Sequence, residues 1–180
     1  PLEWLENNPL KYKKYKAIST VFAELTLYKN LVFKSQFGVD YSHSTGFSQS
    51  YPEYMPNQGD GSAARSSSAA LRLQISNTLT YRFAIDDIHD FNFLLGQEAL
   101  TYHSEGFSVT TAGQSNNKLT DISTGTRATG WSSTSTSDYS TVSFFGRGEY
   151  NYADRYYADF SVRTDGSSRF GKNNRWGAFG

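Results

Sequence analysis

The chain has 180 residues and no net charge, because 17 lysines and arginines balance 17 aspartates and glutamates. Proteins that bind nucleic acids by neutralising phosphates are basic, so this balance argues against that class. The absence of cysteine excludes disulfides and thiolate metal sites, and no run approaches the ~18 apolar residues of a transmembrane helix. With 16% aromatic residues the chain is too rich in aromatics for intrinsic disorder. What remains is a β protein rich in aromatics, serine and threonine.

Neither end of the sequence has the pattern expected at the natural terminus of a protein. Residues 1–9 have no basic, apolar or small-residue region of an export signal. The last residues, 175–180, stop within an alternating pattern. We therefore expect residues 1–180 to be a single segment from inside a longer protein.

The first two predicted strands form a hairpin. They cover residues 17–27 and 31–43 and are separated by a tight turn at 28–30. In the second strand the apolar and the polar residues alternate, which is typical of a strand with one apolar face. The apolar face holds Leu31, Phe33, Phe37, Val39 and Tyr41, and the polar face holds Lys34, Gln36, Asp40 and Ser42.

The clearest segment covers residues 70–85, after a predicted loop at 44–69. Seven of its eight odd positions are apolar or aromatic, the exception being Asn77, and no even position holds a bulky apolar residue. At about 3.3 Å per residue such a strand spans roughly 50 Å, whereas ordinary strands have about 5–6 residues. Its length therefore indicates a structure taller than a common sheet.

Four further strands follow the same rule. They are predicted at 90–103, at 140–152, at 156–165, and from about Asn174 onward. The apolar side is formed by Phe91, Phe93, Leu95 and Ala99 in the first, by Val142, Phe144, Tyr150 and Tyr152 in the second, and by Tyr156, Ala158, Phe160 and Val162 in the third. No helical period is visible, so the predicted class is all-β, an antiparallel meander of about seven strands.

The connections alternate in length. Short ones fall near 28–30, 86–89 and 153–155, whereas long ones fall at 44–69 and 104–139, with an intermediate one at 166–173. Transmembrane barrels combine short periplasmic turns with long extracellular loops in this way. Because lipid offers no partners for backbone groups, such a sheet has to close. Seven strands would then be an incomplete part of a large barrel.

Aromatic residues gather near the short connections, where a barrel carries its membrane-interface girdle. A plainer explanation is that aromatics favour strands in general. We favour the girdle because the residues lie at one rim. They are Tyr28, Phe33, Tyr81, Phe83, Phe91, Phe93, Tyr150, Tyr152 and Tyr156.

The last fifth of the chain carries a specific motif, SFFGRGEYNYADRYYADFSVRTDGSSRFGKNNRWGAFG at residues 143–180. This stretch resembles the signature region of SusC/RagA-type, TonB-linked outer-membrane proteins. Gly148 is a small departure, because the family often has a larger residue there. The matching residues are Gly146, Arg147, Tyr150, Tyr152, Asp154, Arg155, Tyr156, Arg163, Asp165, Gly166, Ser167, Ser168, Arg169, Phe170, Gly171, Asn174, Arg175, Trp176, Gly177 and Phe179.

The resemblance implies import of large nutrients, glycans or peptides, across the outer membrane of a Gram-negative cell. It implies a TonB-dependent receptor barrel of about 22 strands, with the plug and the remaining strands outside residues 1–180. The implied partners are membrane lipid, a SusD-like surface lipoprotein, the TonB complex and the substrate. It implies no cofactor and no enzymatic activity.

The residues themselves suggest structural roles for the motif. Residues 152–156 read as a tight turn between aromatics, and Asp165-Gly166 as a strand end that uses glycine's access to positive φ. Arg163, Asp165 and Arg169 are expected to form structural pairs rather than a binding site.

No catalytic or metal-binding set is recognisable. His43, His89 and His103 are isolated, and a cluster of Asp86, Asp87 and Asp90 lies in a short connection. A glycosidase needs two carboxylates about 5–10 Å apart in a cleft, and a short turn does not form such a cleft.

Substrate contacts are therefore sought in the long loops. Aromatic faces there can stack on sugar rings, while amides and hydroxyls bond to them; the same residues could instead pack the loops or meet a lid protein. The candidates are Phe47, Tyr51, Tyr54, Phe107, Trp131 and Tyr139.

Two other classes stay open. A secreted or surface-exposed all-β protein, such as a carbohydrate-binding module or an adhesin, would bury Leu71, Leu73, Ile75 and Leu79 between two sheets. A passive porin would share the barrel without a plug.

Overall fold

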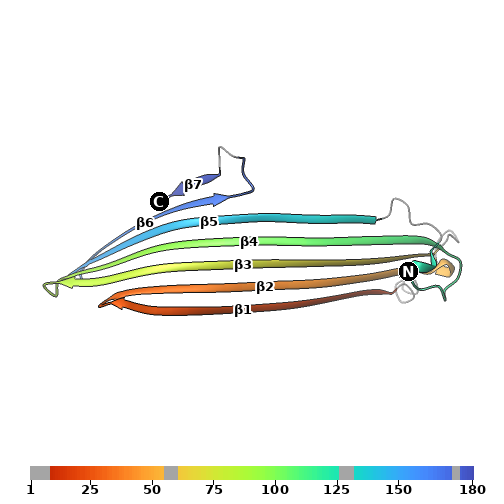
Figure 1. Cartoon of the computed structure of the whole chain (residues 1–180), viewed down its shortest axis with the longest axis horizontal. Helices are drawn as coiled ribbons and strands as arrows, with labels where there is room; N and C mark the ends of the chain where they lie inside the picture. Colours follow the sequence, from red (N-terminus) through yellow and green to blue (C-terminus); the bar gives the residue numbers. More distant parts are fainter. Residues whose placement is uncertain (1–8, 55–60, 126–131, 172–174) are drawn as a thin grey trace. The chain divides into compact units, whose positions relative to one another are not determined.

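A computed structural model describes residues 9–54, 61–125, 132–171 and 175–180. Their strands form a single seven-stranded sheet in chain order, so that β1 and β7 are its two edges (Figure 1). Two short 3-10 turns, η1 and η2, interrupt the strand pattern. The elements are β1 (Leu10–Tyr28), β2 (Leu31–Ser50), η1 (Pro52–Tyr54), β3 (Gly61–Ile85), β4 (His89–Gln114), η2 (Ile122–Thr124), β5 (Ser132–Tyr152), β6 (Tyr156–Ser167) and β7 (Trp176–Phe179).

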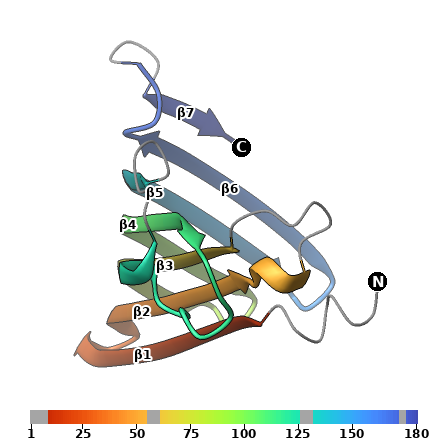
Figure 2. The ribbon, with the colours of Figure 1, turned by 90° about the vertical axis from the view of Figure 1, so that its right-hand side faces the viewer.

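The chain divides into two compact units. Unit 1 holds residues 1–17, 41–71 and 103–137, and unit 2 holds residues 18–40, 72–102 and 138–180. Unit 1 contains η1, η2 and the adjoining strand ends (Figure 2), whereas unit 2 contains the short turns, β6 and β7. The predicted all-β class and the antiparallel meander of seven strands are confirmed.

The three short turns of unit 2 lie where the sequence predicts them. Asn30 has a φ of 65°, Asp86 and Asp87 have φ of 54° and 51°, and Ala153 and Asp154 have φ of 53° and 55°. Asparagine and aspartate tolerate this left-handed region, since their side chains bond to nearby backbone. The Asn151 side-chain oxygen, for example, accepts a hydrogen bond from the Asp154 N–H at 3.1 Å.

The long connections are much shorter than predicted. Strand β2 continues to Ser50 and β3 begins at Gly61, so that the predicted loop at 44–69 shrinks to the interval between them. Likewise β4 continues to Gln114 and β5 begins at Ser132. These strand ends lack an apolar face, and serine pairs link them instead: the Ser44 and Ser68 hydroxyls lie 2.7 Å apart, as do those of Ser108 and Ser133.

The pairing of β5 with β6 confirms the predicted faces of both strands. Tyr150 pairs with Ala158 and Tyr152 with Tyr156, while Glu149 pairs with Asp159. Directly opposed residues of a sheet point to the same side. One side therefore carries the apolar residues and the other side the charged residues.

The sheet has almost no interior. Among the described residues only Ala63 and Ala112 are buried apolar side chains, and Ile75 is 38% exposed. Leu71, Leu73 and Leu79 are half-buried at most, not enclosed between two sheets. The described residues therefore do not show the two-sheet core that a soluble sandwich would have. In the described part of the chain, no helix has the length and apolarity needed to cross a membrane.

Gly166 corrects one prediction. It lies inside β6, pairs with Val142 and Trp176, and is not among the residues with positive φ. Its small size serves a different purpose, because a Cβ there would lie 3.0 Å from the Trp176 ring. Gly166 therefore leaves space for the indole ring of Trp176 and does not form a turn.

The seventh strand begins at Trp176; the predicted start at Asn174 lies outside the described residues.

Candidate functional site

A chain of polar contacts crosses β3, β4, β5 and β6 on the polar side of unit 2. Arg82 donates to Asn92, and Asn92 in turn donates to Glu149 at 2.5 Å. Arg147 bridges Glu149 at 2.8 Å and Asp159 at 2.5 Å. We call these five residues the polar-face network. They surround a hollow of about 710 Å³ near the short turns.

Arg163 organises a second group on the same side. It donates to Asp165 at 2.8 Å and to Glu98 at 3.1 Å, and its guanidinium lies 5.5 Å from the centre of the Phe145 ring. Gly96 provides the space, because a Cβ there would lie 2.1 Å from the Phe145 ring. The predicted pairing of Arg163 with Asp165 is present. Arg169 instead lies 3.9 Å from the centre of the Tyr139 ring.

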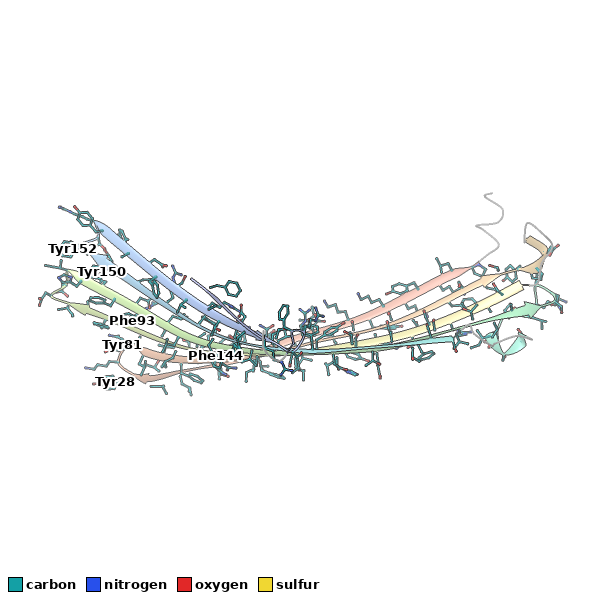
Figure 3. The ribbon with its side chains drawn as sticks, turned by 90° about the horizontal axis from the view of Figure 1, so that it is seen from above. Tyr28, Tyr81, Phe93, Phe144, Tyr150 and Tyr152 are labelled. Carbon is teal, nitrogen blue, oxygen red and sulfur yellow. The ribbon has the colours of Figure 1, made fainter. Side chains whose placement is uncertain are left out.

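The opposite side of unit 2 carries an aromatic cluster near the short turns. Figure 3 labels two of its members, Phe93 and Tyr150. Phe83 stacks on Phe91 at 4.9 Å between ring centres, and Phe91 contacts Tyr150 at 5.0 Å. His89 shares a hydrogen bond of 2.7 Å with the Tyr150 hydroxyl. Such rings, apolar in body and polar at the tip, suit the boundary between lipid and water.

One polar pair interrupts the apolar side. Asn77, the exception in the predicted face of β3, donates to Gln97 of β4 at 2.8 Å. Both groups are partly buried there. The bond explains how an amide is tolerated among apolar residues, because a polar group away from water needs a partner.

Four of the six predicted substrate contacts fall in or beside unit 1 strands. Phe47 lies in β2 with the Arg65 guanidinium 4.9 Å from its ring centre, and Phe107 lies in β4 with 53% exposure. Tyr51 follows β2, and Tyr54 ends η1. Trp131 lies outside the described residues. Of the four described residues, none is brought to the polar-face network.

Tyr139 is the sixth, and it belongs to unit 2. Its ring stacks on Tyr102 at 5.0 Å between centres, and Arg169 covers it. In β5 it has the same parity as Ser143, which pairs with Asp165 of the charged side. Tyr139 therefore lies on the polar side, where two aromatic faces and a cation meet.

The motif residues occupy β5, its turn, β6, the following bend and β7. Gly148 leaves room for Phe93, since a Cβ there would lie 3.3 Å from that ring, and Gly146 does the same for Leu95. Trp176 stacks near Phe144 at 6.3 Å. The Ser168 N–H donates to the Ser140 carbonyl at 2.9 Å, and Phe170 is 61% exposed. Gly146, Gly148 and Trp176 thus make packing contacts, whereas the structural role of the whole motif stays a prediction.

The isolated histidines have ordinary partners. His43 bonds with the Ser67 hydroxyl at 3.1 Å, and His103 also makes an interaction. Over the part of the chain that the structure describes, no group of three potential ligands is suited to a metal ion.

Sequence reasoning missed several contributors. Asn92, Glu98 and Tyr102 join the polar-side groups only through cross-strand pairing. Their even positions in the strand at 90–103 indicate that these side chains lie on the polar face of the sheet. The positions do not indicate which residues of the neighbouring strands they contact.

Comparison with known proteins supplies independent information. The chain is 35% identical over 91 residues to the TonB-dependent receptor SusC of Bacteroides thetaiotaomicron, a match that covers 51% of this chain and 9% of that protein. It is 53% identical over 38 residues to the TonB-dependent receptor P3 of Formosa agariphila, covering 21% and 4%. No family model matches the chain.

Solved structures match almost the whole chain. The RagAB peptide transporter superimposes with a TM-score of 0.89 at 30% identity, over 96% of this chain and 20% of that chain. The resemblance to the SusC/RagA barrel is confirmed. The RagAB peptide importer in its 'open-open' state gives the same TM-score at 31% identity, over 97% and 19%.

The chain is therefore similar to only a part of the SusC/RagA proteins. The chain spans about one tenth or less of the curated relatives it matches and about one fifth of the solved chains. A single sheet with two open edges is what such a part of a barrel wall has to be.

Proposed function

We propose that residues 1–180 form one segment of the β-barrel of a TonB-dependent importer in the outer membrane of a Gram-negative cell. The importer takes up large nutrients, oligosaccharides or peptides, with energy from the TonB complex. The observation that carries this proposal is the superposition on RagAB, with a TM-score of 0.89 over 96% of the chain at 30% identity. The plug, the remaining strands and the TonB contact belong to the rest of the protein.

The two faces of the sheet support this role. Lipid covers the side that holds Phe83, Phe91 and Tyr150, and the aromatic cluster marks a membrane boundary. The polar-face network faces the lumen, where water and neighbouring polar groups solvate its charges. This arrangement needs no second protein layer over the apolar side.

Among the predicted substrate contacts, Tyr139 has the most suitable surroundings. Its ring, Tyr102 and Arg169 form a polar-side surface that can stack on a sugar or peptide group. Phe47 and Phe107 have the parity of Tyr41 and Leu95, which belong to the apolar alternation. Substrate contact by them, or by Tyr51, Tyr54 and Trp131, stays a prediction, as does a SusD-like lipoprotein as the lid.

The test is uptake by cells. A strain that lacks the gene should fail to grow on one class of glycan or peptide, and a plasmid copy should restore growth only when TonB is present. Restored growth without TonB would indicate a passive pore. Unchanged growth on every class, or a wild-type protein that is absent from the outer-membrane fraction, would contradict the proposal.

A further inference from the structure

Unit 1 contains a pocket with strongly basic walls. It has a volume of about 490 Å³ and is lined by residues of β1, β2 and β3 and by the segment before η2. Its charged side chains are Lys11, Lys13, Arg65 and Asp121. We call this site the basic pocket. Neither the polar-face network nor Tyr139 contributes to it.

One cation of the pocket is already engaged. Arg65 forms an ion pair with Asp121 at 3.0 Å and lies over the Phe47 ring at 4.9 Å. These contacts hold the guanidinium in place and neutralise Asp121. Lys11 and Lys13 are exposed, and neither has a partner among the residues that the structure describes. Among the described residues, the pocket thus has about two positive charges without an acidic partner beside an ordered arginine.

The pocket opens on the side of the strands that carries apolar residues. Within unit 1, Phe47 of β2 has the parity of Tyr41, and Arg65 of β3 has the parity of Leu71. A strand keeps its sides along its length, because successive side chains alternate. A substrate passing through a lumen on the polar side would not meet this pocket.

The pocket also lies at a suitable distance from the apolar band. Arg65 is six residues from Leu71, which is about 20 Å along a strand and roughly 15 Å in height at the tilt of a barrel strand. The polar layer of a membrane begins where its hydrocarbon ends, and lysine side chains reach several ångströms toward such a boundary. In the proposed barrel, a pocket at this height lies outside the hydrocarbon, on the side where the headgroups and sugars of a glycolipid are found.

We propose that the basic pocket binds the phosphate groups of the anionic glycolipid that forms the outer leaflet of the outer membrane. This inference rests on the proposed barrel, since only a membrane-embedded sheet presents this side to lipid. Phosphate suits the site because lysines act as point charges toward its oxygens, while Arg65 adds directed donors. The Phe47 ring can cover the apolar part of the headgroup.

The test uses the full-length protein in detergent and compares two double variants. Lys11→Gln with Lys13→Gln removes the pocket lysines, whereas Lys14→Gln with Lys16→Gln changes the charge of the same strand equally. In β1 Lys14 has the opposite parity, and it is not part of the pocket. Binding of phosphorylated lipid A is measured by thermophoresis. We expect roughly tenfold to thirtyfold weaker binding for the pocket variant and less than twofold change for the control.

Two further probes identify the ligand. Lipid A whose phosphates have been removed should bind the wild-type protein as weakly as phosphorylated lipid A binds the pocket variant. Inorganic phosphate at millimolar concentration should not displace phosphorylated lipid A. Equal losses in both double variants, undiminished binding of dephosphorylated lipid A, or displacement by inorganic phosphate would each overturn the proposal.

Membrane location and uptake separate this proposal from the proposed function. If the wild-type protein is absent from the outer membrane or fails to import nutrients, the importer is contradicted first. If it imports nutrients from the outer membrane while the pocket variant binds phosphorylated lipid A unchanged, only the lipid site is wrong.

Discussion

Ala153 adopts a backbone conformation that alanine rarely adopts. Its φ of 53° lies in the left-handed region, where a Cβ crowds the following carbonyl at a cost of roughly 1–2 kcal/mol. The turn tolerates the strain because flanking contacts hold it. The Ala153 N–H donates to the Ile88 carbonyl at 2.8 Å, and the Arg155 N–H donates to Tyr152 at 3.0 Å.

Glycine at position 153 should relieve this strain. We expect Ala153→Gly to raise the free energy of unfolding by about 0.5–1 kcal/mol, after the entropy of glycine is subtracted. Ala158→Gly is the control, because Ala158 lies in β6 and has no positive φ. It should lower stability by about 0.5–1 kcal/mol. Urea unfolding of the full-length protein in micelles measures both, and destabilisation by both would contradict the strain argument.

Gly96 permits the Phe145 ring to lie across β4. Gly96→Ala would place a Cβ 2.1 Å from that ring, so the ring must move, and we expect its contact with Arg163 to weaken. We expect a loss of about 1–3 kcal/mol in the free energy of unfolding. Gly171→Ala, where a Cβ meets nothing within 4 Å, should change stability by less than about 0.5 kcal/mol. Similar effects of both substitutions would show that the ring can give way easily.

The carboxylate of Asp121 is one of the groups that hold the segment around η2 in place. Asp121 accepts hydrogen bonds from the Ser123 N–H at 3.1 Å and from Arg65 at 3.0 Å. The Ser123 backbone bond, followed by the Arg65 side-chain bond, holds the pKa of Asp121 below its ordinary value of 3.8. A depressed pKa means that the stabilisation is present above the ordinary value and is lost as the pH falls through the lowered one.

Acid should therefore loosen this segment. A spin label at Lys118→Cys should show restricted motion at neutral pH and increased motion as the pH falls below 3.8. Asp121→Asn removes the charge and should make the label mobile at every pH. A label whose motion in the parent protein does not change between neutral pH and pH 2.5 would contradict this role of Asp121.

The elements show what the sequence could and could not predict. Alternation located the apolar parts of β2 to β6 and their faces, since period two is a local property of each strand. It could not find the outer ends of the strands, where Ser44 and Ser68 meet and no apolar face is required. Register was also hidden, so the partners of Asn77 and Arg163 could not be named. Gly166 is predicted at a strand end because glycine can adopt positive φ, whereas its contact with Trp176 depends on the pairing of β6 with β7.

At the scale of the molecule, the apolar side of unit 2 is uncovered among the described residues. Leu95 is 62% exposed and Phe160 is 69% exposed, although both belong to the apolar alternation of their strands. In a water-soluble protein, burying each such side chain stabilises the folded state by about 1.5–3 kcal/mol. A sheet that leaves them exposed needs another apolar medium, and lipid is that medium in our account.

Charge placed on the two sides should therefore have unequal effects. Leu79→Arg puts a charge on the apolar side and should lower the free energy of unfolding in lipid by about 2–4 kcal/mol. Thr80→Arg adds the same charge one residue later on the polar side, where a change below about 1 kcal/mol is expected. Folding into vesicles of phosphatidylcholine measures both, and equal losses would contradict the assignment of the faces.

Lipid contact along β3 tests the central claim most directly. The chain has no cysteine, so single cysteines at positions 71 to 83 can each carry a nitroxide in the full-length protein within its native membrane. We expect collisions with oxygen, which concentrates in lipid, to be frequent at odd positions, and collisions with a water-soluble nickel complex to be frequent at even positions. A profile without this period of two, or odd positions shielded from oxygen, would contradict the barrel.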